Sequence, residues 1–176
     1  MRQILIVISV ALFLLSCSSK NESVPAEKTV VAVDTLQYPY KATYSSDLTV
    51  PSNPANAQMV LKIWKLFEGK QFDSVKFFYA DTVTYNNSGG FHFYGSSAQL
   101  LDYAKKDFES LDSLRFDLSM WQSVHINDRN EDWVYIWATE RRYEKGKGDT
   151  SLMHEQWQVK NNKVCFFNQY SAKYIK

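Results

Sequence analysis

Side chains that can transfer protons gather in the C-terminal half of the sequence. His154 and Glu155 are neighbours in "SLMHEQWQV", Glu140 lies in "WVYIWATERRY", and His125 precedes the polar segment "NDRNED". Imidazole and carboxyl groups are the usual general acids and bases of enzymes. Neighbouring residues of a strand point to opposite faces, so His154 and Glu155 cannot act together on one substrate. His154, Glu155 and His125 are therefore candidates for acid–base chemistry that form no recognisable pair.

Other chemistries have no support in the sequence. The three histidines, which include His92, are spread over separate segments without the spacing of metal ligands. The only two cysteines, Cys17 and Cys165, cannot make a disulfide framework or a cysteine metal site. No nucleophile elbow, phosphate loop or dinucleotide-binding motif occurs. We expect no metal and no cofactor.

Three helices are predicted in the first half of the domain. The first follows Asn53 as the cap and Pro54 in its first turn, and Gly69 stands just past its end. Its apolar face repeats at helical spacing, at Val60, Ile63, Trp64 and Phe67. A shorter helix is predicted over 71–79. A third begins at Ser96, where Gln99 completes a capping box.

The apolar spacing then changes from a helical period to a period of two. Strands are predicted over 81–85, 114–120, 133–143, 151–159 and 164–174, the last two joined by the polar turn "KNNK". Helices followed by a series of strands are typical of an α+β fold with helices on one face of a sheet.

This order resembles the nuclear transport factor 2-like superfamily, which includes SnoaL-like polyketide cyclases and ketosteroid isomerases. The phrases that carry the resemblance are "FEGKQFD", "YADTVTY", "FYGS", "NEDWVYIWATE" and "EQWQVKNNKV", within residues 54–174. The resemblance implies a cone-shaped α+β barrel, in which three N-terminal helices pack on a strongly bent antiparallel sheet and enclose a cavity.

The aromatic content supplies a wall for such a cavity. Aromatic residues make up 15% of the chain, with 11 Tyr, 11 Phe and 5 Trp. Ligand pockets are concave and mostly apolar, with a few placed polar groups. The alternative is that these large side chains fill the cone. The residues that we expect at the pocket are Trp64, Tyr85, Asn87, Trp121, Trp137 and Trp157.

The best-known chemistry of the superfamily is not expected. The resemblance places Asn87 where ketosteroid isomerase has its catalytic aspartate, and it places Lys62 near the position of the oxyanion-binding tyrosine. An asparagine amide has no accessible basic state and cannot take a proton from carbon. We therefore do not expect the ketosteroid isomerase mechanism, and we lean against catalysis.

The N-terminus predicts a secreted, lipid-anchored protein. Arg2 precedes an apolar segment, 4–15, that is too short for a mature spanning helix, and "LLSC" resembles a bacterial lipobox ending at Cys17. An ordinary signal peptide with an incidental cysteine is the alternative. The predicted division is a signal peptide over 1–16, a flexible tether over 17–36, an extended arm over 37–53 and the cone domain over 54–176.

The net charge of the chain limits the kinds of partner that we expect. The net charge is +1, from 20 basic and 19 acidic residues, so nucleic-acid binding is not expected. Three functions stay open: non-catalytic binding of a small apolar or amphipathic ligand at the membrane, an enzyme of hydratase, isomerase or cyclase type, and a structural subunit of an envelope complex. We expect a cell-envelope location, at the outer membrane, and a homodimer through the sheet.

Overall fold

The first predicted helix has the predicted ends. In the computed structural model, which describes residues 42–174, α1 spans Pro54–Glu68. The Asn53 side chain accepts a hydrogen bond from the amide of Ala55 at 3.0 Å, and the amide of Gly69 donates to the carbonyl of Lys65 at 3.1 Å. Val60 and Ile63 have no exposed surface and Trp64 is buried, so α1 is fixed to the sheet by its apolar side.

The other two helices are shorter. α2 spans Phe72–Val75 and continues as a 3₁₀ helix over Lys76–Phe78, where a single longer helix was predicted. α3 spans Ser97–Glu109, and its capping box is present. The hydroxyl of Ser96 accepts a hydrogen bond from the amide of Gln99, and the Gln99 side chain accepts one from the amide of Ser96.

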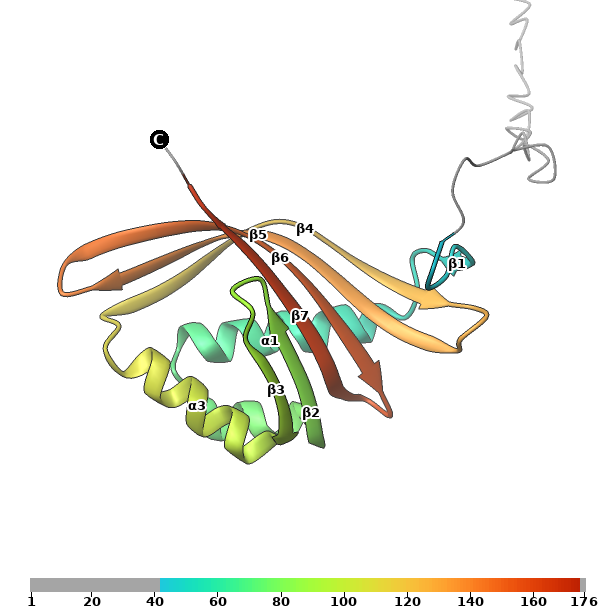
Figure 1. Cartoon of the computed structure of the whole chain (residues 1–176), viewed down its shortest axis with the longest axis horizontal. Helices are drawn as coiled ribbons and strands as arrows, with labels where there is room; N and C mark the ends of the chain where they lie inside the picture. The colour runs from blue at the N-terminus through green and yellow to red at the C-terminus, as the bar shows by residue number, and fades with distance from the viewer. Residues whose placement is uncertain (1–41, 175–176) are drawn as a thin grey trace, which may run out of the picture. The chain divides into compact units, whose positions relative to one another are not determined.

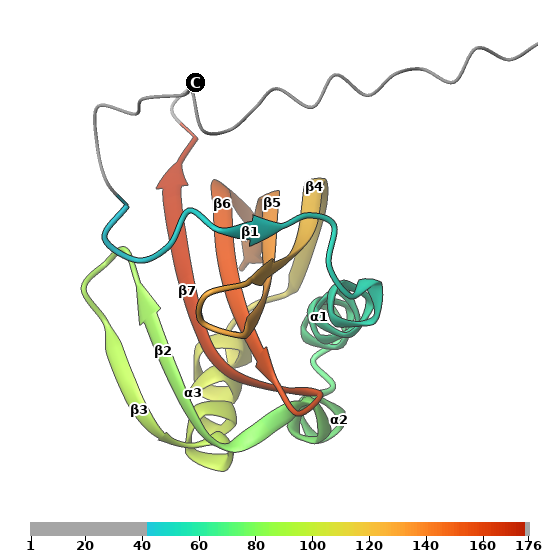
Figure 2. The same ribbon diagram turned by 90° about the vertical axis from the view of Figure 1, so that its right-hand side faces the viewer.

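Within the described part of the chain, seven strands form one bent sheet. They are β1 (Leu48–Thr49), β2 (Tyr79–Asn87), β3 (His92–Ser96), β4 (Ser113–Ile126), β5 (Glu131–Glu144), β6 (Lys147–Lys160) and β7 (Lys163–Lys173). Their order in the sheet is β1-β4-β5-β6-β7-β2-β3. Figure 1 shows α1 and α3 under the concave side of the sheet, and Figure 2 shows the same arrangement end-on. The α+β fold class predicted from the sequence is confirmed, with three helices against this sheet.

Two details of the predicted sheet were wrong. The sheet is mixed and not purely antiparallel, because β2 pairs with β7 in parallel. β2 and β7 are joined through the rest of the chain and not by a hairpin, so no tight turn dictates their relative direction. β3 was not predicted, although Phe91 and Phe93 alternate with exposed His92 and Tyr94 there. Gly89 and Gly90 lie in the turn of the β2–β3 hairpin, where Gly90 adopts a φ of +86°.

A bulge in β4 changes which residues face the helices. The pairing with β5 shifts between Leu118 and Met120, which leaves Ser119 as an extra residue. The predicted alternation from Leu114 to Met120 therefore breaks, and Met120 pairs with Trp137 on the outer face. Trp121, opposite Ile136, lies on the inner side at the edge of the sheet.

The expectations for the N-terminal segments lie mostly outside the described residues. The predicted signal peptide, tether and Cys17 fall there, as does 37–41 of the predicted arm. The rest of the arm, 42–53, contains β1, which pairs with β4. Within 42–174 no helix has the length and apolarity needed to cross a membrane.

Candidate functional site

A buried glutamate from β6 lies at the centre of the candidate site. Glu155 stands between Met153 and Trp157 on the inner face of the strand, and only 4% of its surface is exposed. Two indoles donate hydrogen bonds to its Oε2, from Trp64 Nε1 at 2.9 Å and from Trp157 Nε1 at 2.8 Å. α1 and β6 thus hold one carboxylate oxygen from two sides.

The other carboxylate oxygen is linked to β7 and β2. Gln169 Nε2 donates to Glu155 Oε1 at 3.0 Å, and Tyr85 donates its hydroxyl hydrogen to Gln169 Oε1 at 2.7 Å. A carboxylate offers about four acceptor positions. The three bonds from Trp64, Trp157 and Gln169 occupy three of them, so one position of Oε1 has no donor among residues 42–174 and is left for a proton or a ligand.

The environment of Glu155 makes it a group that titrates near neutrality. Burial raises the pKa of its carboxyl from 4.5 to about 7, against the opposite effect of the hydrogen bonds from Gln169, Trp157 and Trp64. Desolvation disfavours the charged form of a carboxyl, and hydrogen bonds to that form favour it. At pH 7 the group is therefore present in both protonation states.

A second polar cluster lies between β5 and α3. Glu140 and Arg142 are two residues apart on β5, so both point inward. Arg142 Nη2 is 2.7 Å from Asp107 Oδ2 on α3, and Arg142 Nη1 is 3.9 Å from Glu140 Oε1. Glu140 is 8% exposed, and burial raises the pKa of its carboxyl. Arg142 and Asp107 also line a surface groove, so this pair stands between the cavity and solvent.

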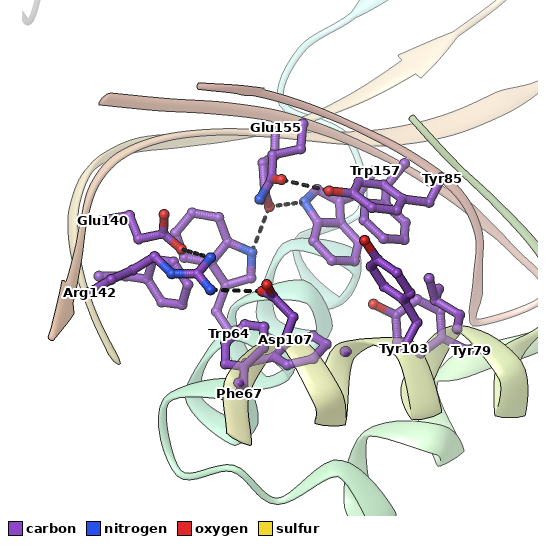
Figure 3. A pocket seen from close by; sticks show the side chains of 16 residues that line it. Trp64, Phe67, Tyr79, Tyr85, Tyr103, Asp107, Glu140, Arg142, Glu155 and Trp157 are labelled. Atoms are coloured by element: carbon purple, nitrogen blue, oxygen red, sulfur yellow. Dashed lines mark hydrogen bonds and ion pairs between the residues drawn. The ribbon is translucent and has the colours of Figure 1, made fainter. Parts of the chain in front are cut away.

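These two clusters share one cavity of about 110 Å³ (Figure 3). Aromatic rings make up most of its wall and stack on one another, as Trp157 does on Phe167 at a centroid distance of 4.5 Å. Tyr79 is 3% exposed, and its hydroxyl has no hydrogen-bond partner among the described residues. The lining residues outside the two clusters are Phe67, Tyr79, Leu100, Tyr103, Ala104, Phe108, Phe116 and Phe167.

The residues that the sequence assigned to the pocket divide into two groups. Trp64, Tyr85 and Trp157 line the cavity. Asn87 does not; its Oδ1 accepts the amides of Gly89 at 2.9 Å and Phe91 at 3.1 Å, so its side chain holds the β2–β3 turn. This is the turn-supporting role that an asparagine suits.

Trp121 and Trp137 also lie outside the cavity, contrary to the expectation for both. Trp121 is 50% exposed and lies in a surface depression beside Ala57 and Leu61 of α1. The β4 bulge turns it to the inner side opposite Ile136, but β4 is the edge strand at this point, because β1 pairs only with His125 and Ile126. Trp137 is on the outer face, since it pairs with His154 while Ile136 faces the core. The register of the sheet decides both positions.

The candidate histidines are remote from the cavity. The ring of His154 stacks on Trp137 at 4.7 Å on the outer face, and desolvation lowers the pKa of His154. His125 Nδ1 is 2.9 Å from Asp132 Oδ1, on strands β4 and β5. Of the three acid–base candidates, Glu155 alone lines the cavity.

Several lining residues were missed from the sequence. Side chains two residues apart in a strand point to the same face, so the sequence could have predicted that Glu140 lies beside Arg142 and that Glu155 lies beside Trp157. Asp107, Tyr79 and Gln169 come from other elements, and only the tertiary fold brings them in. No group of three or more His, Cys, Asp or Glu side chains within residues 42–174 is arranged to hold a metal ion.

Comparisons with known proteins identify the fold. No family model and no curated protein matches the sequence. An epoxide hydrolase of the LEH-like type from M. tuberculosis has a TM-score of 0.59 at 11% identity, over 69% of this chain and 86% of its own. A SnoaL-like polyketide cyclase, described as putative, from Shewanella putrefaciens has a TM-score of 0.57 at 10% identity, over 68% and 91%.

A third solved structure has a bound small molecule. It is a hypothetical protein from Catenulispora acidiphila with a ketosteroid isomerase-like fold, in complex with trimethylamine, and has a TM-score of 0.53 at 14% identity over 64% of this chain and 84% of its own. At these identities the similarities establish the nuclear transport factor 2-like fold and no activity.

Proposed function

We propose that this protein binds a small amphipathic ligand, without transforming it, in the cavity between α1, α3 and the inner face of the sheet. The observation that carries the proposal is the wall itself, in which aromatic faces surround two polar clusters built on Glu155 and Arg142. Small-molecule sites combine a mostly apolar wall with a few placed polar groups. The trimethylamine complex of the Catenulispora protein supports a small organic ligand for a cone of this fold.

Filling the cavity tests this proposal. Ala104 lines the cavity from α3, whereas Ala98 on the same helix is exposed to solvent. We expect wild-type protein and Ala98→Phe to gain thermal stability with a ligand from a panel of small amphipathic compounds, by about 2.7 kcal/mol at a hundredfold excess over Kd. Ala104→Phe should lose this gain. Equal gains in Ala104→Phe, or no gain for any compound in wild type, would refute the proposal.

The binding domain is proposed to be attached to the cell envelope. The support is the apolar segment 4–15 followed by "LLSC", which ends at Cys17. One acyl chain gives marginal membrane binding, and additional chains give stable anchoring. Metabolic labelling with an alkynyl fatty acid should label wild type in the outer-membrane fraction and leave Cys17→Ala unlabelled. Equal labelling of the variant would show that the lipid is elsewhere.

An acid–base enzyme is the second candidate, and one observation favours it. Glu155 is buried in the cavity with a pKa of about 7, where a general acid or base is most effective at neutral pH. The Glu155→Gln variant decides between the two functions if a bound compound is converted. An enzyme that uses Glu155 should lose about 10²–10⁴-fold in kcat. A binder shows no conversion in either protein.

A further inference from the structure

The charges of the cavity wall are unbalanced. Three carboxyls line it, from Asp107, Glu140 and Glu155, and Arg142 is the only basic residue among the lining residues. Arg142 already contacts Asp107 at 2.7 Å and lies 3.9 Å from Glu140. Glu155 has no cationic side chain within 4.0 Å among the described residues, and its three hydrogen bonds come from neutral donors. Within residues 42–174 the negative charge of ionised Glu155 therefore has no cationic side chain at ion-pair distance.

The rest of the wall suits a positive charge. Nine of the lining residues are aromatic. Trp64 packs on Phe116 at 4.2 Å and Tyr85 on Phe167 at 4.4 Å, so a cation in the cavity meets the ring faces and edges that these pairs leave uncovered. The face of an aromatic ring attracts a cation, most strongly where water is excluded, and aromatic cages of this kind recognise quaternary ammonium groups. The unpartnered hydroxyl of Tyr79 adds a polar oxygen in the same buried wall.

We propose that the ligand of this cavity is a small organic cation, an alkylammonium or quaternary ammonium group held in the aromatic cavity beside the Glu155 carboxylate. The inference rests on the proposed binding function and names its chemical class. A dry cavity of about 150 Å³ accommodates benzene, so 110 Å³ accommodates about four to five non-hydrogen atoms. A larger ligand extends past Arg142 and Asp107 towards solvent.

The geometry couples this binding to a proton. A proton on the open acceptor position of Oε1 neutralises Glu155, whereas a positive ligand is attracted to the ionised carboxylate, so binding of the ligand favours release of the proton. The side chains that α1 and β7 contribute to the cavity are uncharged, namely Trp64, Phe67, Phe167 and Gln169. The ionisable groups that face the cavity from the other elements also act on this equilibrium. They are Glu140 and Arg142 on β5, Asp107 and Tyr103 on α3, and Tyr79 and Tyr85 on β2. Tyr79 and Tyr85 stay neutral near pH 7, since burial raises their pKa further.

Matched probes test the charge of the ligand. Tetramethylammonium and tert-butanol have the same number of non-hydrogen atoms and similar shapes, and the charge of tetramethylammonium does not titrate. We expect the full-length protein in mild detergent to bind tetramethylammonium at least about tenfold more tightly than tert-butanol at pH 8 by isothermal titration calorimetry. Binding should be about tenfold weaker at pH 6, and about half a proton should be released per ligand at pH 7.

A variant pair tests the residue. Glu155→Gln removes the charge and should lose both the preference for the cation and the pH dependence. Glu109→Gln removes an exposed carboxyl from α3 outside the cavity and should bind as wild type does. If Glu155→Gln fails to fold, the comparison of tetramethylammonium with tert-butanol in wild type still tests the charge of the ligand.

Different results would refute the cationic ligand and the proposed binding function. Equal binding of tert-butanol and tetramethylammonium, or cation binding that is unchanged in Glu155→Gln, overturns the cation while a binding cavity remains. If neither probe binds but another amphipathic compound does, and Ala104→Phe abolishes that binding, the cation is again wrong and the binding function stands. If no compound of any charge binds, both are wrong.

Discussion

Replacement of Glu155 by glutamine should change how the free energy of unfolding depends on pH, so a comparison of the variant with wild type isolates the contribution of Glu155. In the folded protein the pKa of Glu155 is raised by burial from 4.5 to about 7. Between these values the folded state holds a proton that the unfolded state has released, so stability falls as pH rises. The stability from the neutral carboxyl is complete below pH 4.5 and is lost as pH rises through about 7.

The size of the effect follows from the shift. One pKa unit corresponds to about 1.4 kcal/mol, and integration of the two titration curves from pH 5 to pH 8 gives a loss of about 2.5 kcal/mol in wild type. Glutamine does not titrate, so Glu155→Gln should lack this loss. The free energy of unfolding of the variant minus that of wild type should therefore rise by about 2.5 kcal/mol over this range, as measured by urea denaturation at several pH values.

The difference curve separates this effect from others. Glutamine changes the hydrogen bonds to Trp64, Trp157 and Gln169, which shifts the whole curve by a constant and leaves its slope unchanged. Glu140, whose pKa burial also raises, titrates in both proteins and largely cancels. A difference that is flat between pH 5 and pH 8 would refute the conclusion that Glu155 is stabilised as the neutral acid.

Three further substitutions test other parts of the structure. Gln169→Leu removes a donor to the Glu155 carboxylate, so the midpoint of the pH-dependent loss of stability should move to higher pH; an unmoved midpoint would mean that the hydrogen bond does not form. Ile63→Ala, at a position with no exposed surface, should cost about 2–5 kcal/mol in urea denaturation, and a cost below 1 kcal/mol would contradict the packing of α1 on the sheet. Asn53→Ala should cost about 0.5–2 kcal/mol through loss of the α1 cap, and no loss would show that water replaces the side chain.

The helices were the most predictable part of the fold because their signals are local. Asn53, Pro54 and the Ser96–Gln99 box mark their starts within a few residues, and each forms the expected cap. The parallel pairing of β2 with β7 had no such signal, because it depends on how segments about eighty residues apart meet. The β4 bulge was hidden too, since Leu118 and Met120 continue the apolar alternation across it.

Only those relations within the site that lie inside a single helix or strand could be predicted from the sequence. Trp64 was expected on the inner face of α1, and Glu155 and Trp157 share a strand face by period two. The face of β6 that points towards the helices decides the rest of the site, because a shift of this strand by one residue would place His154 in the cavity in place of Glu155. Trp137 was assigned to the pocket for its size, and the register placed it outside.

The open acceptor position on Glu155 distinguishes the two candidate functions by the direction of their pH dependence. A cation binder needs ionised Glu155, so its affinity rises through pH 7 and no product forms. A general acid needs the protonated form, so its rate falls through the same pH, and a general base gives the opposite slope with turnover. Because Trp64, Trp157 and Gln169 occupy the other acceptor positions, any proton that Glu155 exchanges with a ligand passes through this one position on Oε1. A ligand that binds without any effect on the titration of Glu155 therefore does not reach the carboxylate, and it would place the functional contact at Arg142 and Asp107 instead.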